Sequence, residues 1–191
     1  MLTDRIIGAF TFRREVYGEV EKDTAFTNTA WMLVAVVGFL NQLGAHAQPN
    51  ILRWFFGALL GTVGVVLAFA LGAYVVAWVG RALFNAEVTF EELVRTLGLA
   101  YVWNVVGVVG ILAGFSSALA CILTPALIAA AILGLIAWFV AAKEALDLEW
   151  TQTIITVVIG WVVLLVITFL VGVVLGAIGL GAAAVGRAIV R

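Results

Sequence analysis

The chain has 191 residues, of which 65% are hydrophobic and 11% are charged, and its formal net charge is −1. Soluble domains are about 45–50% apolar and about 25% charged, so this composition excludes a water-soluble globular protein. The charge balance favours no nucleic-acid partner, and the single cysteine, Cys121, excludes an internal disulfide and a cysteine-based metal site.

The first 23 residues place apolar side chains at helical spacing between charged ones. This pattern predicts one or two short amphipathic helices that lie in the cytoplasmic membrane interface with their apolar side down. A solvated tail is the alternative interpretation. The apolar positions are Leu2, Ile6, Ala9 and Phe10, followed by Phe12, Val16, Tyr17 and Val20.

Four later stretches lack Asp, Glu, Lys and Arg and are long enough to cross a bilayer. A spanning helix needs about 20 apolar residues, because ~30 Å of hydrocarbon is crossed at about 1.5 Å per residue. The third stretch holds two spans, since a turn is expected between Gly114 and Pro125. The stretches are residues 24–52, 54–80, 96–142 and 150–186.

We therefore predict an all-α integral membrane bundle, with residues 1–23 as the interfacial segment and residues 24–191 as one five-span domain. Membrane β-barrels are excluded, because they alternate apolar and polar residues, whereas residues 161–172 are apolar on every face. The expected spans are at about residues 27–45, 55–79, 97–117, 123–142 and 153–175.

Helix boundaries are predicted from local signals at three places. Thr89 and Glu92 form a capping-box pattern in the second loop. Thr124 followed by Pro125 predicts the start of the fourth spanning helix, with proline in the first turn. Glycines at 172, 176, 179 and 181 predict that the last helix ends or bends, leaving residues 176–191 as a separate piece.

The distribution of Lys and Arg predicts the orientation in the membrane. Positive loops stay cytoplasmic, which places the N-terminus inside and the C-terminus outside. Three basic residues fall on the expected outer side, at Arg53, Arg187 and Arg191. The remaining seven fall on the expected inner side, at Arg5, Arg13, Arg14, Lys22, Arg81, Arg95 and Lys143.

Small residues recur on one face of the second span, which predicts close helix packing where no hydrophobic effect drives association. Similar faces occur in the third and fourth spans and in the tail. The sequence leaves open whether these faces meet one another or a second copy of the chain. The second-span packing residues are Gly57, Gly61, Gly64, Ala68 and Gly72.

No catalytic, cofactor-binding or metal-binding constellation is predicted, because the expected span interiors contain no ionisable residue. Asn104 lies within the third span, where an interhelical hydrogen bond is favoured over contact with a solute. His46 is the single histidine. We interpret it as a solvated loop residue, and ligation of a metal, haem or pigment stays an alternative.

Two segments resemble bacterial members of the Yip-domain family, whose eukaryotic relatives interact with Rab-type GTPases. Residues 90–101 resemble the loop entering the third span, and residues 138–148 resemble the tryptophan-bearing fourth span and its short charged loop. The resemblance implies a non-enzymatic protein of a bacterial cytoplasmic membrane, active in membrane organisation, trafficking or assembly. GTPase binding is not carried over, because the Asp-Leu-aromatic-Gly-Pro motif is absent.

The functional expectation is a scaffold or accessory subunit that associates with membrane lipids and other membrane subunits. A small permease or channel for an uncharged solute, with a path between spans three to five, is the alternative. A lined cavity reaching Asn104 would favour transport, and a closed bundle with an apolar outer groove would favour the scaffold.

Overall fold

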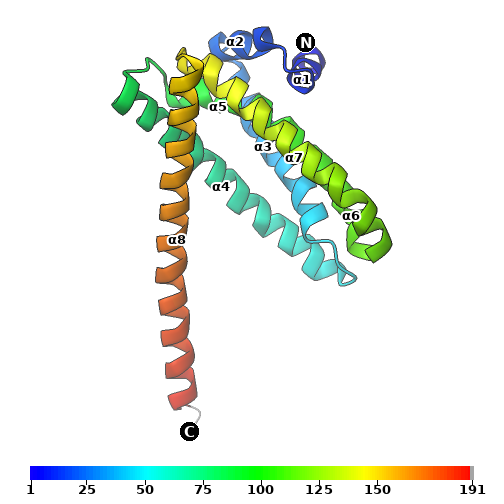
Figure 1. Cartoon of the computed structure of the whole chain (residues 1–191). Coiled ribbons are helices and arrows are strands. Elements are labelled where there is room, and N and C mark those ends of the chain that lie inside the picture. The colour runs from blue at the N-terminus through cyan, green and yellow to red at the C-terminus, as the bar shows by residue number, and fades with distance from the viewer. Residues whose placement is uncertain (190–191) are drawn as a thin grey trace.

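The computed structural model describes the backbone of residues 1–189 and the side chains of residues 1–167, 169 and 170. Within that part the chain is helical throughout and contains no strand (Figure 1). The elements are α1 (Leu2–Phe10), α2 (Arg14–Lys22), α3 (Phe26–Ala45), α4 (Ile51–Phe84), α5 (Phe90–Ala100), the 3₁₀ helix η1 (Tyr101–Val109), α6 (Gly110–Phe115), α7 (Ser117–Leu146) and α8 (Trp150–Ile189).

The all-helical membrane fold predicted from the sequence is confirmed. Among the described residues, five helical stretches are long and apolar enough to cross a membrane. The third of these stretches joins α5, η1 and α6 in one continuous span. The five are Phe26–Ala45, Ile51–Phe84, Phe90–Phe115, Ser117–Leu146 and Trp150–Ile167.

Side-chain caps set the starts of several helices. The capping box that the sequence predicts at α5 is present: the Thr89 hydroxyl accepts from the Glu92 N–H, and the Glu92 carboxylate accepts from the Thr89 N–H. The Asn50 side chain accepts from the Arg53 N–H and begins α4. At their other ends α4 and α7 close on left-handed residues, Asn85 and Asp147.

The prediction that the fourth spanning helix begins at Thr124 and Pro125 is wrong. Ser116 takes that role, because its extended backbone makes the corner and its hydroxyl accepts from the Leu119 N–H at 3.4 Å. Pro125 lies inside α7. Proline has no N–H to donate to the carbonyl four residues before it, and membrane helices tolerate such a gap.

The predicted break in the last helix is also wrong. α8 runs unbroken from Trp150 to Ile189, and in Figure 1 it extends past the ends of the other helices. Its 40 residues correspond to about 60 Å, roughly twice the hydrocarbon thickness. Glycine costs about 1 kcal/mol in a helix, and this cost does not break α8 at any of the four glycines.

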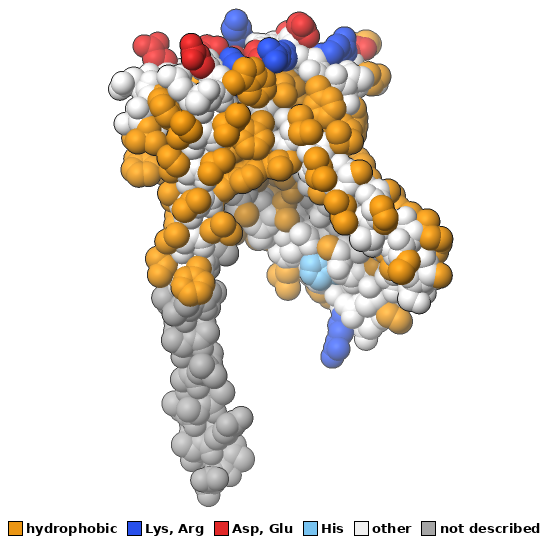
Figure 2. Space-filling model, viewed as in Figure 1, with side chains coloured by type: hydrophobic (Ala, Val, Ile, Leu, Met, Phe, Trp, Pro, Cys, Tyr) orange, Lys and Arg blue, Asp and Glu red, His pale blue; other side chains and the backbone are white. Residues whose placement is uncertain are grey.

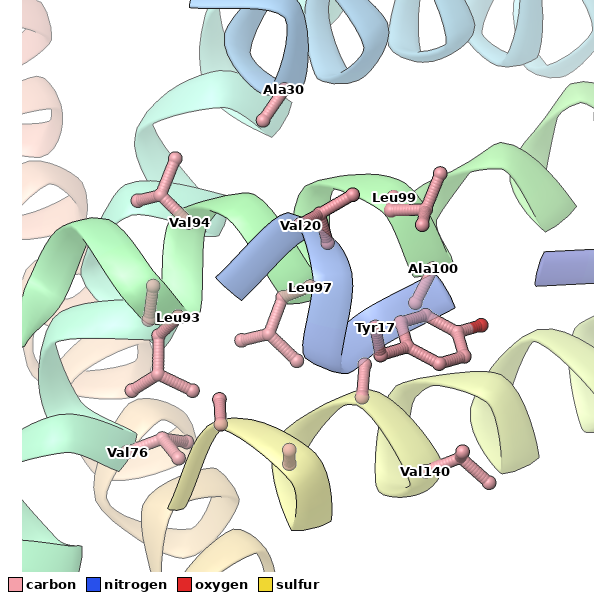
Figure 3. Close-up of a cluster of buried hydrophobic side chains, with 14 of the residues drawn as sticks. Tyr17, Val20, Ala30, Val76, Leu93, Val94, Leu97, Leu99, Ala100 and Val140 are labelled. Atoms are coloured by element: carbon pink, nitrogen blue, oxygen red, sulfur yellow. The ribbon is translucent and has the colours of Figure 1, made fainter. Parts of the chain in front are cut away.

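The buried core gathers at the end of the bundle that carries the two N-terminal helices. Figure 3 shows Tyr17 and Val20 of α2 among side chains of α5, with Val76 of α4 and Val140 of α7 at the edges of the cluster. Towards the opposite end α8 leaves the other spanning helices, which stay together (Figure 1).

The N-terminal segment forms the two predicted short helices, α1 and α2. Much of the apolar side that the sequence assigns to the lipid interface contacts the protein instead, and Ala9, Tyr17 and Val20 have no exposed area. The reason is that these side chains reach the ends of α5 and α7, where contact with apolar residues removes both surfaces from water. Leu2 and Ile7 remain exposed.

Candidate functional site

The third span changes its helical pitch in the middle of the membrane segment. Residues Tyr101–Val109 form a 3₁₀ helix nine residues long, whereas most 3₁₀ runs stop after three or four. A stretch of this kind inside a longer helix often marks a functional hinge. Trp103, Asn104 and Gly107, which make the contacts described below, lie on this segment.

Glycines let the backbones of α3 and the third span approach one another. A methyl group added at Gly44 would overlap the carbonyl oxygen of Gly107, and one added at Gly110 would come within 3.1 Å of the Gly44 carbonyl oxygen. At the end of the span, a methyl at Gly114 would lie 2.8 Å from the Ala47 carbonyl oxygen. A side chain at Gly44 or Gly114 would therefore displace the neighbouring backbone, and one at Gly110 would require it to shift slightly, which explains the glycines.

Two asparagines meet at this contact. The Asn41 side-chain amide donates to the backbone carbonyl of Asn104 at 3.0 Å, and the Asn104 amide donates to the Tyr101 carbonyl at 3.2 Å. The interhelical hydrogen bond expected at Asn104 is therefore made by its backbone carbonyl, whereas its side chain braces the 3₁₀ turn. Gly107 leaves room for the Asn41 amide, since a methyl there would overlap it.

A groove of about 430 Å³ opens beside this pair. Its walls come from the end of α3, from η1 and α6, and from the first half of α7. Glycine, alanine and aliphatic residues make most of its lining, and its polar side chains are those of Asn41, Trp103 and Asn104. A second, smaller pocket of about 260 Å³ lies between Asn104, Trp138 and Trp161.

The N-terminal helix closes the inner end of the groove through Trp103. The indole N–H donates to the Ala9 carbonyl at 3.3 Å, and the indole ring stacks on Phe12 with centroids 5.5 Å apart. Phe10 packs edge-on against the same ring at 5.0 Å. Phe12 holds a left-handed backbone with φ of 55°, a strained conformation for a bulky residue. The α1–α2 corner is thus shaped to fit this tryptophan.

Arg95 is a buried charged residue, which from the sequence counts only as one of the basic loop residues. Its side chain is 5% exposed, and its guanidinium donates to the carbonyls of Val20 and Glu21 and to the Thr27 hydroxyl. Those carbonyls end α2, where the helix leaves its acceptors unpaired. Arg95 therefore fastens α2 to the third span, and a partner 74 residues away gives no local sequence signal.

Charged groups crowd the end of the molecule that carries α1 and α2 (Figure 2). Glu21 lies partly buried there, and its pKa is raised by burial and by the nearby carboxylates of Asp147 and Glu92. Asp23 accepts from Arg5 at 2.8 Å, and this hydrogen bond holds the pKa of Asp23 below its usual range. The Arg14 guanidinium carbon lies 5.2 Å from the centroid of the Trp150 ring, which links α2 to the start of α8.

The small-residue face predicted on α4 meets different neighbours along its length. A methyl at Gly57 or Gly61 would contact His46 and Gln42 of the α3 end, and one at Gly72 would contact Leu164 of α8. Between them Gly64 has no atom within 4 Å of that position, and Ala68 is exposed. The small-residue face of α4 is therefore packed against the end of α3 at one end and against α8 at the other, and it is exposed between them.

His46 ends α3, and its ring Nδ1 lies 3.2 Å from the Gln42 carbonyl oxygen. Over the described residues, no group of three or more His, Cys, Asp or Glu side chains is placed to hold a metal ion. The structure thus brings His46 against Gly57 and Gly61 rather than against further ligating side chains.

Five apolar spans, a buried N-terminal platform and an intramembrane groove define a polytopic α-helical integral membrane protein. A family model described as the Yip1 domain matches residues 7–173, which is most of the chain. The chain belongs to the Yip1 domain family, and the resemblance noted in the sequence is confirmed. No curated protein and no solved structure matches it.

Proposed function

We propose that this Yip1-family protein is a non-catalytic scaffold or accessory subunit that works by associating with other membrane components. Its partners are membrane lipids and further membrane protein subunits, a second copy of the chain included, and it needs no cofactor. Membership of the family supports a role in the membrane. The proposed location is a bacterial cytoplasmic membrane, with the N-terminus inside and the C-terminus outside.

The observation that carries this proposal is the open middle of the α4 small-residue face. Gly64 and Ala68 continue the register of Gly61 and Gly72, yet the chain places no helix of its described part against them. On α7 the small-residue face is open at one end, because Ala126 is exposed whereas Ala141 is buried. Small residues allow close backbone approach in lipid, so these open stretches suit helices of another subunit.

The test compares Gly64→Leu with Val63→Leu, a neighbouring position that is also exposed. Gly64→Leu should reduce the size of the complex extracted from native membranes, because the added side chain separates the helix backbones. Val63→Leu should leave that size unchanged, and both variants should melt like the natural protein in detergent. An unchanged complex with Gly64→Leu, or a monomer in the native membrane, would contradict association through this face.

A permease for an uncharged solute is the second candidate, because the groove reaches Asn104. Transport also needs a continuation past Trp103, which Ala9 and Phe12 hold in place. Proteoliposomes carrying the full chain should show no specific solute flux if the scaffold proposal is right. A specific flux that Asn104→Leu abolishes would replace the scaffold with a transporter.

A further inference from the structure

The groove beside η1 contains two amide oxygens that the protein's own hydrogen bonds leave free. Each NH₂ group is already committed, that of Asn41 to the Asn104 carbonyl and that of Asn104 to the Tyr101 carbonyl. If either side-chain amide were flipped, its oxygen would face the backbone carbonyl oxygen that now accepts its NH₂ group. These hydrogen bonds therefore fix the orientation of both side chains.

Both oxygens are accessible. Over the described residues no donor reaches either Oδ1 atom, and the buried side-chain atoms without a partner there are the hydroxyls of Tyr17 and Thr156. The Oδ1 atoms of Asn41 and Asn104 are therefore not sealed inside the protein, and both residues line the groove, Asn104 also lining the smaller pocket. A polar oxygen at membrane depth is stabilised when a donor reaches it.

The remaining lining decides which donor fits. The Trp103 indole N–H is already used by the Ala9 carbonyl, and the other lining residues are glycine, alanine, valine and leucine. The lining contains no Asp, Glu, Lys, Arg or His, so a charged ligand would lose hydration without a counter-charge. A neutral hydroxyl group matches the site, because its O–H can donate to the free amide oxygens, which are acceptors only.

The shape of the groove admits such a molecule from two sides. Its lining begins at Ala47, in the connection between α3 and α4, and descends to Asn104 and Trp103. Along α7 the groove is bordered by two small side chains, Ala130 and Ala131, which are at least partly exposed and leave this side open. The volume of about 430 Å³ falls in the range of roughly 300–1,000 Å³ typical of ligand sites.

We propose that this groove binds an uncharged, hydroxyl-bearing molecule through the side-chain oxygens of Asn41 and Asn104. Diacylglycerol is the bilayer source of that chemistry. Its free hydroxyl would donate to the side-chain amide oxygens, and its acyl chains would lie along α7 beside Ala130 and Ala131. Glycerol is the aqueous source of the same chemistry. The site goes beyond the proposed association, which uses Gly64 and Ala68 of α4 and requires no ligand.

The experiment uses the full chain in phosphatidylcholine nanodiscs and measures the melting temperature against added ligand. Three probes are compared: diacylglycerol, its 3-O-methyl ether, which lacks the donor, and glycerol added to the buffer. Diacylglycerol should raise the melting temperature with an apparent affinity roughly tenfold better than its methyl ether, as one lost hydrogen bond implies. A response to glycerol that matches or exceeds that to diacylglycerol would assign the same site to the aqueous source.

Two variants locate the response. Asn104→Leu should lower the apparent affinity roughly tenfold, since it removes one acceptor. Ala131→Leu should abolish binding by filling the groove, whereas Ala129→Leu, which lies outside the lining, should bind like the natural protein. Because Ala131 and Ala129 are both exposed, the two alanine variants should melt alike without ligand.

The proposal is overturned if diacylglycerol and its methyl ether bind equally well, or if neither diacylglycerol nor glycerol shifts the melting temperature. It is also overturned if Ala131→Leu binds as well as Ala129→Leu. None of these outcomes bears on the Gly64 experiment, so the groove and the association surface can fail separately.

Discussion

At the residue scale, Arg95 connects the N-terminal helices to the membrane bundle. Arg95→Met would leave the Val20 and Glu21 carbonyls unpaired in a buried place, at a cost of about 1–3 kcal/mol. We expect a lower melting temperature in detergent and faster proteolysis within α1 and α2. Arg81→Met is the control, because Arg81 is exposed and makes one long contact of 3.5 Å to Val88. Equal losses in the two variants would contradict the role given to Arg95.

Glu21 gives a pH-dependent prediction. Its pKa is raised by burial and by Asp147 and Glu92, so the ionised carboxylate destabilises the folded state at neutral pH. Glu21→Gln should therefore melt at a higher temperature than the natural protein at pH 7. The difference should disappear as the pH falls below the ordinary range of a glutamate, about 4.3. Glu19→Gln, on the exposed side of the same helix, is the control. A stability gain that persists at low pH would have another origin.

The residue-scale features differ in how far the sequence predicts them. The Thr89–Glu92 capping box is local, and it was predictable because both partners lie within one helical turn. The contacts of Arg95 and Trp103 join residues 74 and 94 positions apart. Such pairings depend on how the N-terminal helices fold back, which the sequence pattern does not encode locally.

At the scale of elements, the contact between α3 and the third span gives a stability prediction. Gly44→Ala would place a methyl group against the Gly107 carbonyl, and backbone atoms cannot move aside as a flexible side chain can. The expected cost is about 1–3 kcal/mol or more of unfolding free energy. The matched control is Gly64→Ala, also in a spanning helix and with nothing within 4 Å. Detergent melting should separate the two, and equal behaviour would show that α3 does not approach the span so closely.

The glycine patterns show what periodicity can and cannot predict for these helices. A face of small residues on α4 was visible in the sequence, but the neighbours of that face were not. Gly44, Gly107 and Gly110 make closer backbone contacts than Gly57 or Gly72, and the 3₁₀ pitch of η1 shifts their register away from simple α-helical spacing. Likewise Pro125 and the glycines of α8 suggest breaks by the rules of soluble helices, whereas α7 and α8 continue through them.

At the scale of the whole molecule, the clustering of charge at one end supports a topology prediction. In a Cys121→Ser background, cysteines replacing Glu19 and Glu87 should be shielded from an impermeant thiol reagent in intact cells. A cysteine replacing Gln48, at the opposite end of the bundle, should react. Labelling of Glu87→Cys without labelling of Gln48→Cys would invert the proposed orientation.

In the architecture as a whole, the buried core lies at the end that carries α1 and α2, and α8 leaves the other spans at the opposite end. The five spans and their helical nature followed from the length of the apolar stretches, because bilayer thickness fixes helix length. The gathering of the core beneath α1 and α2 did not follow, since an apolar helix face can be covered equally by lipid or by protein. The open middle of α4 results from that arrangement, and the proposed function depends on it.

Cross-linking at Gly64 in native membranes tests association through α4 most directly. With Cys121 replaced by Ser, Gly64→Cys should form an oxidative adduct with a second chain or be captured by a short bifunctional thiol reagent. Val63→Cys, one position away on the exposed surface, should yield much less product. Equal yields at the two positions, or no adduct at either, would contradict the claim that this protein works by joining other helices at the open face of α4.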